Sequence, residues 1–336
     1  MKMNKKRPIL RRAAIPAVLA LLCTLFWFGK PNDFGLGRNM ELLVNMMREL
    51  SLFYVDEVDP DQLMQDAAEG MNLVIENYNR GVQITWQVYT PEEIAENSSL
   101  GMVQLYYFPA KTANAKYAIV VPGNGGNTTA ELNEGASIAN QLNELGYAAF
   151  VLRYRSFLNA SDNAPLYDIA NAIKYLTENA DQFGVQRENY ALMGFSSGGH
   201  IVGLIGSDNE KFGYKAFGLP QPAALLLGYP INDMTYIKPI YHDIQDIGAY
   251  SPKYYTRNLS DEITPDYPAT YHWHGVNEEL VYWRQGPQLE AALQANHVKH
   301  VYRVFNNAPH VCGIGTGTDA ENWLVEATAF WEEQCA

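Results

Sequence analysis

The chain has 336 residues, 47% of them hydrophobic, which is enough for one large core in a single main domain with an N-terminal extension. Six of its 24 basic residues lie within the first 12 positions, so 18 basic residues face 37 acidic ones in the remainder. This acidic balance argues against nucleic acid and anionic membrane surfaces as partners of the folded part.

The first 30 residues predict a signal peptide or a signal anchor. A basic start is followed by an apolar run, residues 13–28, that contains no acidic residue. The run is long for the apolar part of a signal peptide and short for a relaxed membrane span. It ends in Trp27 and Phe28 without a small-residue cleavage site, which favours an anchor that is not cleaved, although cleavage stays open. Either alternative predicts an extracytoplasmic protein, anchored through residues 13–28 or secreted.

Residues 31–80 predict a helical extension. Apolar side chains recur at helical spacing over residues 43–50, and Asp59-Pro60 is a typical start for a second helix with an apolar stripe that reaches Met71. Both helices have an apolar face to bury. We expect a helical pair packed on the main domain, with an interaction or dimer-forming segment as the alternative.

Residues 39–72, which include the stretch YVDEVDP, resemble the N-terminal helical segment of the carboxyl-terminal processing serine peptidases. The resemblance stops there. Nothing after it is similar to the PDZ module or the protease core of that family, so no peptidase residue is carried over.

Residues 81–336 predict one α/β domain. Short apolar runs alternate with helical stripes, which is the pattern of repeated βαβ units and of a mostly parallel sheet with helices on both faces. The expected strands are residues 103–108, 117–121, 147–152, 190–193, 270–273 and 300–305, and the expected helices carry the apolar stripes at 138–145, 166–176, 200–205 and 323–330.

The sequence Gly194-Phe195-Ser196-Ser197-Gly198-Gly199-His200 follows a predicted strand and opens a predicted helix. A serine on such a sharp strand-to-helix turn is held away from its neighbours, and the residues around it must be small. Ser196 is therefore the candidate nucleophile. A glycine-rich turn without catalytic function would have the same local pattern, so the other parts of a site decide.

An oxyanion needs preorganised N–H donors. The loop Val121-Pro122-Gly123-Asn124-Gly125-Gly126 follows a strand well upstream of Ser196, where an α/β-hydrolase keeps its second donor. We predict donors at the backbone around Asn124 and Gly125 and at the N–H of Ser197.

A neutral serine hydroxyl also needs a histidine to take its proton and an acid to orient that histidine. In the α/β-hydrolase fold the acid follows the serine in the chain, and the histidine follows the acid. His310 lies after the last predicted strand and is the predicted base. The acid should follow the preceding strand, where we predict Glu278, with Glu279 as the alternative.

These motifs together resemble the acetyl-xylan-esterase-like and related carbohydrate-esterase branch of the α/β-hydrolases. The matching stretches, within residues 100–334, are VPGNGG, YRS, Pro165 with Asp168, MGFSSGGH, SDEITPDYPATYHWHG and PHVCGIG. The resemblance implies Ser196 as nucleophile, Glu278 as acid and His310 as base, with donors near Asn124, Gly125 and Ser197. Two departures stand out: the usual acid is Asp, and Asn124 interrupts the glycines of the oxyanion loop.

Other chemistry-bearing residues have simpler interpretations. We expect His200 to be a packed, hydrogen-bonded helix residue. His272 and His274 share a strand face at a spacing that could hold zinc, but no third ligand cluster accompanies them. Cys312 and Cys335 could form a disulfide in an exported chain, or remain free thiols.

The sequence thus predicts a serine carboxylesterase that removes acetyl or similar small acyl groups from carbohydrate and needs no cofactor. Aromatic residues expected over the mouth of the site could stack on sugar rings: Tyr236, Tyr241, Tyr254, Tyr255 and Trp283. A peptidase or lipase on the same scaffold, or a non-catalytic binding or assembly protein, remains an alternative. Acyl length, sugar and oligomeric state stay open.

Overall fold

The computed structural model describes residues 60–125, 128–156, 159–160, 163–233, 257–278 and 280–335. All of them belong to one compact unit of the chain, Met46–Ala336. The predicted signal segment and first helix of the extension lie outside the described residues, as do Glu279 and the tyrosines at positions 236, 241, 254 and 255. The domain boundaries therefore stay predictions.

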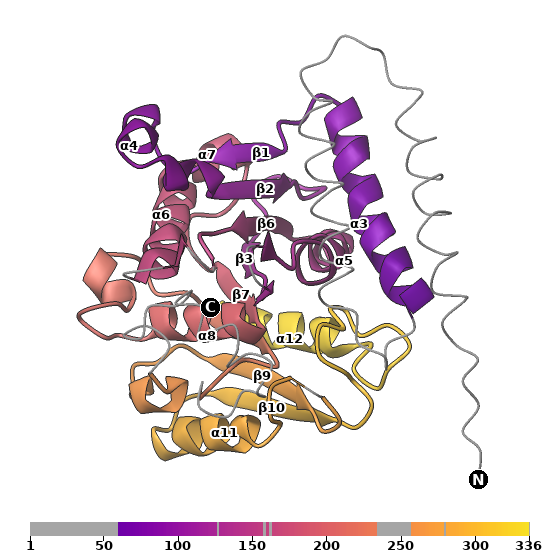
Figure 1. Ribbon diagram of the computed structural model, residues 1–336, viewed down its shortest axis with the longest axis vertical. Coiled ribbons are helices and arrows are strands. Elements are labelled where there is room, and N and C mark those ends of the chain that lie inside the picture. Colours follow the sequence, from indigo (N-terminus) through magenta and orange to yellow (C-terminus); the bar gives the residue numbers. More distant parts are fainter. Residues whose placement is uncertain are drawn as a thin grey trace. The chain divides into compact units, whose positions relative to one another are not determined.

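An eight-stranded sheet forms the centre of the described residues, in the order β1-β2-β6-β3-β7-β8-β9-β10 (Figure 1). The first two strands pair antiparallel to their neighbours, and the others are parallel. The strands are β1 (Thr85–Gln87), β2 (Gln104–Phe108), β6 (Ala148–Arg153), β3 (Tyr117–Val121), β7 (Ala191–Phe195), β8 (Ala224–Gly228), β9 (Thr270–Gly275) and β10 (His300–Phe305).

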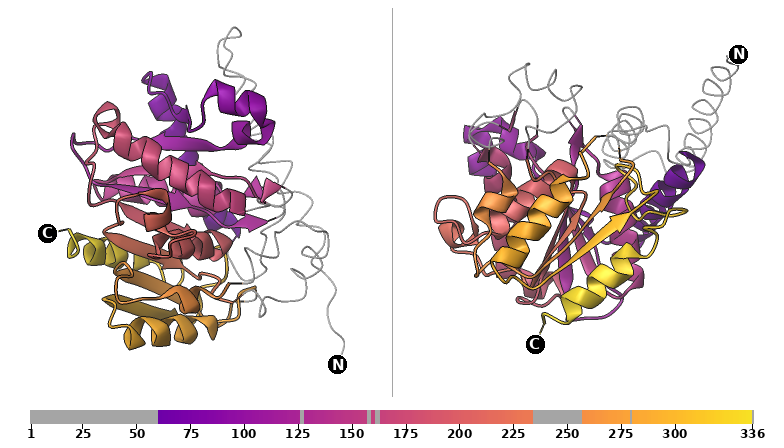
Figure 2. Two further views of the ribbon diagram at one scale, coloured as in Figure 1. Left: turned by 90° about the vertical axis from the view of Figure 1, so that its left-hand side faces the viewer. Right: turned by 90° about the horizontal axis from the view of Figure 1, so that it is seen from below.

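The central strands are apolar on both faces because helices cover both. Every residue of β3, β7 and β8 is buried, which explains why these strands are continuous apolar runs rather than alternating ones. Helices α6 (Ala164–Glu178), α8 (Ser196–Gly206) and α11 (Gln285–Ala295) cover one face, and α5 (Ser137–Glu144) and α12 (Trp323–Glu332) cover the other. Figure 2 shows α11 and α12 on opposite sides of the strands.

Helix α3 (Pro60–Asn79) begins at Pro60, as the sequence predicted, and packs on α5 and on the short helix η2 (Leu132–Ala136). The contact is close: a Cβ on Gly70 would lie 2.6 Å from the backbone carbon of Ala136. This half of the predicted extension therefore packs directly on the α/β layers.

The predicted strands and helices of the α/β domain are confirmed, with ends that differ by one or two residues in several cases. Helix α5 ends before Gly146, whose φ of +99° suits glycine. The sequence interpretation missed β1, β8 and α11. None of the helices in the described part of the chain is long and apolar enough to cross a membrane.

The hypothesis of a Cys312–Cys335 disulfide is wrong in this structure. Both cysteines are free, with Cys312 buried beside the site and Cys335 partly buried at the end of the chain. The Cys335 thiol instead points at the carbonyls of Trp331 and Asn189. Cys312 follows His310 and Cys335 follows the last helix, but these positions in the sequence do not determine the distance between the two sulfurs.

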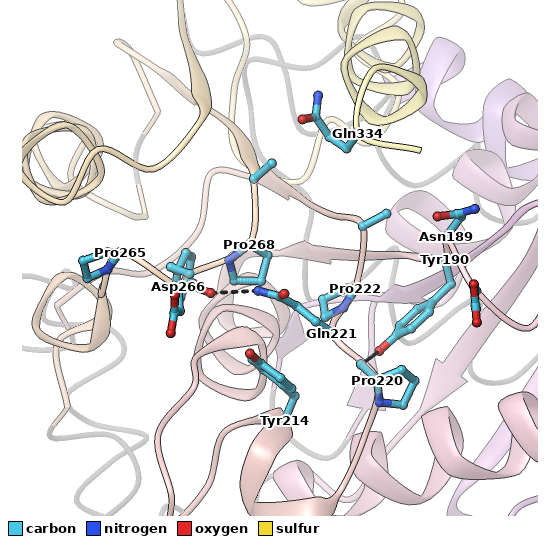
Figure 3. Close-up of a pocket in the computed structure, with 14 residues that line it drawn as sticks. Asn189, Tyr190, Tyr214, Pro220, Gln221, Pro222, Pro265, Asp266, Pro268 and Gln334 are labelled. Atoms are coloured by element: carbon cyan, nitrogen blue, oxygen red, sulfur yellow. Dashed lines mark hydrogen bonds between the residues drawn. The ribbon is translucent and has the colours of Figure 1, made fainter. Parts of the chain in front are cut away.

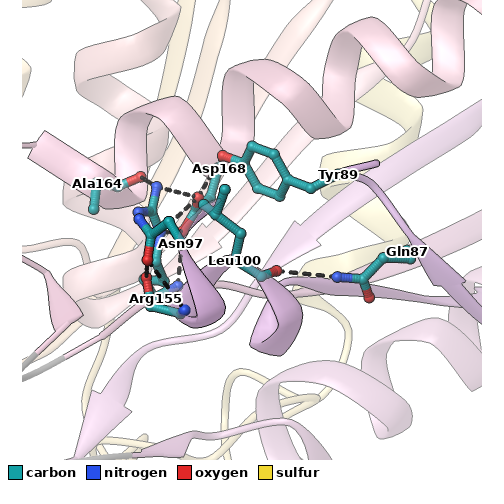
Figure 4. Close-up of polar contacts among 8 residues, drawn as sticks. Gln87, Tyr89, Asn97, Leu100, Arg155, Ala164 and Asp168 are labelled. Atoms are coloured by element: carbon teal, nitrogen blue, oxygen red, sulfur yellow. Dashed lines mark hydrogen bonds and ion pairs between the residues drawn. The ribbon is translucent and has the colours of Figure 1, made fainter. Parts of the chain in front are cut away.

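A buried ion pair connects the loop after β6 to helix α6 and to the segment before α4 (Pro91–Glu96). The guanidinium of Arg155 makes several hydrogen bonds to the Asp168 carboxylate, the shortest at 2.7 Å, and the backbone N–H of Arg155 donates to it at 2.8 Å. The Tyr89 hydroxyl donates to the same carboxylate at 2.7 Å (Figure 4). The Asp168 side chain is fully buried, so it is stabilised by three separate donors.

We predict that Asp168→Asn destabilises the protein by about 3–5 kcal/mol, because it leaves the Arg155 charge buried without its partner. The free energy of unfolding in urea measures this. The matched control is Asp181→Asn, which breaks the exposed Arg187–Asp181 pair at 2.7 Å and should cost less than about 1 kcal/mol. Equal effects of the two substitutions would contradict the prediction.

Candidate active site

Ser196 lies at the turn between β7 and α8, with a φ of +51°. This left-handed conformation is strained for a residue with a side chain and projects Ser196 out of the turn. The surrounding glycines have no room for a side chain: a Cβ on Gly194 would lie 2.7 Å from the Gly198 carbonyl oxygen, and one on Gly198 would lie 2.2 Å from the Val121 oxygen. The local sequence therefore permits the turn where larger residues would prevent it.

The structure brings Ser196, His310 and Glu278 together from three separate segments. The His310 Nε2 atom lies 2.9 Å from the Ser196 Oγ, and its Nδ1 atom lies 2.9 Å from a Glu278 carboxylate oxygen. The other Glu278 oxygen accepts the backbone N–H of Val281. These segments meet because β7, β9 and β10 are parallel and end at the same edge of the sheet.

This chain of hydrogen bonds is nearly closed to water. The side chains of His310 and Glu278 are each only 1% exposed. Burial by itself would lower the pKa of His310, but the charge and hydrogen bond of Glu278, together with the charge of Glu134, raise it above its ordinary value. The ring is thus held as a base that accepts a proton readily.

The predicted oxyanion loop lies against Ser196. A Cβ on Gly123 would lie 3.0 Å from the Ser196 Cβ. The Asn124 N–H donates to the Ser197 hydroxyl oxygen at 2.9 Å, so the residue that interrupts the glycines of this loop contacts the residue that follows Ser196. Gly125 pairs with Thr128 in the two-residue strands β4 (Asn124–Gly125) and β5 (Thr128–Thr129).

Two tyrosines and a carboxylate shape this loop, and the sequence interpretation missed all three. The Tyr154 hydroxyl donates to the Pro122 carbonyl at 2.8 Å. Glu134 accepts the Gly123 N–H at 2.6 Å and the Tyr229 hydroxyl at 2.8 Å. The sequence signal for a buried role of Glu134 was an acidic residue among the small residues of NEGASIA, residues 133–139.

Three other histidines that the sequence singled out, His200, His272 and His274, contact residues of the fold. His200 is buried and its Nδ1 lies 2.8 Å from the Ile231 carbonyl oxygen, which confirms the expected packed helix residue; burial lowers its pKa to about 4. His274 contacts the Pro230 carbonyl oxygen at 3.0 Å, and His272 stacks on Tyr302. Within the described ranges, no group of three or more His, Cys, Asp or Glu side chains is arranged to hold a metal ion.

A pocket of about 690 Å³ lies at the other edge of the sheet, where β7, β8 and β9 begin. Its polar groups bind one another: the Gln221 amide donates to the Asp266 carbonyl, and the Tyr190 hydroxyl donates to the Pro220 carbonyl (Figure 3). Because Ser196 lies at the opposite strand ends, this pocket is separate from the hydrogen-bonded site.

The strand order, the serine on a strand-to-helix turn and the acid and histidine after the later strands are those of the α/β-hydrolase fold. Comparisons with known proteins agree. Residues 103–222 match the model of the BD-FAE family. Over 261 residues the chain is 26% identical to an acetylxylan esterase of Xylanibacter ruminicola, a match that covers 74% of this chain and 52% of that protein. Over 220 residues it is 30% identical to endo-1,4-beta-xylanase B of Butyrivibrio fibrisolvens, which covers 61% of this chain and 34% of that protein.

The chain therefore spans about half, or a third, of the length of these curated relatives. Solved structures share the fold. The acetyl ester-xyloside bifunctional hydrolase of Caldicellulosiruptor lactoaceticus has a TM-score of 0.59 at 22% identity, over 69% of this chain and 88% of that one. The carboxylesterase Cest-2923 of Lactobacillus plantarum has the same TM-score and identity, over 69% and 92%. These matches confirm the resemblance that the motifs indicated.

We predict that Gly198→Ala destabilises the protein by about 1–3 kcal/mol, because the added Cβ collides with the backbone of β3 and must displace the turn. The free energy of unfolding measures this. Gly101→Ala is the control, since its Cβ would meet only one side-chain carbon, at 3.4 Å. Equal losses of unfolding free energy for Gly198→Ala and Gly101→Ala would contradict the prediction.

Proposed function

We propose that this protein is a serine carboxylesterase that hydrolyses small acyl esters, of the acetyl type, on carbohydrate. The observation that carries the proposal is the continuous hydrogen-bonded chain Ser196–His310–Glu278, with 2.9 Å at each step on the histidine. A hydroxyl needs a general base to become a nucleophile, and the base needs a group that fixes its tautomer and stabilises its charged form.

The three side chains have distinct roles in the reaction. His310 Nε2 takes the Ser196 proton while Oγ attacks the acyl carbonyl carbon, and Glu278 stabilises the imidazolium that forms. The tetrahedral intermediate then collapses, the bond to the sugar oxygen breaks, and His310 returns the proton to that oxygen. Water, deprotonated by His310, attacks the acyl carbon, the bond between that carbon and the Ser196 Oγ breaks, and His310 returns the proton to Oγ as the carboxylic acid leaves. No step calls for a cofactor.

The oxyanion is stabilised by backbone N–H groups at Ser197 and in the segment Asn124–Gly125. In the resting structure the Asn124 N–H is bound to the Ser197 hydroxyl. The oxyanion must therefore replace that hydroxyl as acceptor, or use the next N–H of the loop. Either arrangement places preorganised donors where negative charge develops, which is commonly the largest electrostatic contribution to such reactions.

Carbohydrate as the substrate class is supported by the relatives. One of the curated matches is named for activity on acetylxylan and the other as a xylanase, and one structural neighbour is described as an acetyl ester-xyloside hydrolase. Peptidase or lipase action on the same scaffold is the second candidate, since the same triad would serve it. We also propose, from the basic and apolar first 30 residues, that the enzyme acts outside the cytoplasm.

We predict that Ser196→Ala lowers kcat/KM for p-nitrophenyl acetate on the order of 10⁴-fold or more, because the attacking oxygen is removed. Ser99→Ala, at a half-buried position in the short helix η1 (Ser98–Met102), is the matched control and should retain activity. Esters of longer acyl chains and acetylated xylan, assayed in parallel, separate the candidates: release of acetate from xylan with poor hydrolysis of long chains supports the proposal. Hydrolysis by Ser196→Ala at the wild-type rate would refute it.

The acid limb of the pH dependence of kcat/KM should have its midpoint above the ordinary histidine value of about 6.5. His310 must be neutral to take the proton, so activity falls as pH falls through its pKa, which Glu278 and Glu134 raise. Initial rates at low substrate concentration, measured from roughly pH 5 to pH 9, give the midpoint of this acid limb. A midpoint below the ordinary value would show that burial dominates instead.

A further inference from the structure

We infer that Glu134 is a second carboxylate of this site, a positioning residue that fixes Gly123 of the oxyanion loop and stabilises the charged form of His310. The inference rests on the proposed esterase function and deepens it. His310 would then be stabilised by two carboxylates, Glu278 and Glu134, which lie on different elements of the fold.

The contacts of Glu134 are those of a carboxylate acceptor. It lies in η2, only 1% exposed, and each of its oxygens receives a separate donor: the Gly123 N–H at 2.6 Å and the Tyr229 hydroxyl at 2.8 Å. An ionised carboxylate accepts at both oxygens, which fits two donors without a further proton.

Both donors also touch the catalytic groups. Gly123 lies between the carboxylate and the nucleophile, since a Cβ built on it would be 3.0 Å from a Glu134 oxygen and 3.0 Å from the Ser196 Cβ. The Tyr229 ring centre is 4.7 Å from that of His310. Glu134 thus reaches the nucleophile through one neighbour and the base through the other.

The charges around His310 explain why a second carboxylate matters. Burial and, less strongly, the Glu278 charge raise the pKa of Glu134 above its ordinary value, and the His310 charge, the Gly123 N–H and the Tyr229 hydroxyl oppose that rise. When His310 takes the serine proton, its positive charge lies in a closed site where attraction is strong. Glu134, in η2, then stabilises the same positive charge that Glu278, after β9, stabilises.

Three further titratable groups near His310, among the residues that the structure describes, are neutral in the working pH range. His274, on β9, is kept uncharged because burial and His272 lower its pKa to about 3. Burial raises the pKa of the Cys312 thiol, on the loop of His310 itself, and that of the Tyr229 hydroxyl after β8. The two carboxylates therefore set the electrostatics of the base.

The test is the pH profile of kcat/KM for p-nitrophenyl acetate with Glu134→Gln. Loss of the negative charge should lower the His310 pKa, so the acid limb moves to lower pH by about half a unit or more. The plateau kcat should fall about tenfold or more with little change in KM, because the charged base is less stabilised in the transition state. Glu134→Asp, which keeps the charge, should restore the limb toward its wild-type position.

The matched control is Glu131→Gln. Glu131 is also buried and lies three residues earlier, but it binds Thr129 at 2.7 Å and pairs with Arg153 at 3.5 Å. This substitution should leave the limb in place. If the acid limb of Glu134→Gln has its midpoint at the wild-type pH, the inference is overturned, and Glu134 only holds Gly123 in place.

If Glu134→Gln does not fold, Glu134→Met, which has a similar length and also carries no charge, supplies the same test. The limb should again move to lower pH, and an unmoved limb would overturn the inference. Failure of the esterase proposal is distinguishable, because it would appear as full activity in Ser196→Ala, whereas failure of this inference leaves an active, Ser196-dependent enzyme with an unshifted limb.

Discussion

The buried hydrogen bond between His310 and Glu278 is the constraint on which the site depends. Both side chains are almost fully withdrawn from water, and such groups are tolerated in a core only when each satisfies the other. The pair must therefore form whenever the protein folds, and it fixes the ring so that the other nitrogen faces Ser196 at 2.9 Å. Parallel pairing of β7 through β10 supplies the geometry, because it delivers all three loops to one edge of the sheet.

Strain at this edge is the counterpart of that geometry. Ser196, Tyr229 and Val311 have φ values of +51°, +38° and +62°, and each lies in one of the loops that build the site. Non-glycine residues adopt such conformations only where the surroundings enforce them. Here the surroundings are close contacts at Gly198 and Gly123 and the buried acceptor Glu134, so the predicted oxyanion loop, Ser196 and His310 are positioned by one continuous set of contacts.

The sequence predicted what depends on local pattern and chain order. Ser196 was predicted from its turn, and His310 and Glu278 from their places after successive strands, and the structure brings the three side chains together. Contacts that exist only after folding could not be read in this way: Glu134 reaches Gly123 and Tyr229 across 11 and 95 residues. The same reason explains the mistaken disulfide hypothesis and the unforeseen bond from Asn124 to Ser197. Strand β8 was missed although Pro222 and Gly228 bound its apolar run, because a short run of alanine and leucine has no period that distinguishes a buried strand from a helical segment.

The central claim is that one of two adjacent serines is activated by a distant histidine. Reaction with a fluorophosphonate, followed by mass spectrometry of the peptide that contains residues 194–200, tests it directly. The account predicts a single adduct per chain, on Ser196, that disappears when His310 is replaced by alanine. An adduct on Ser197, or labelling of Ser196 that is unaffected by the loss of His310, would contradict it.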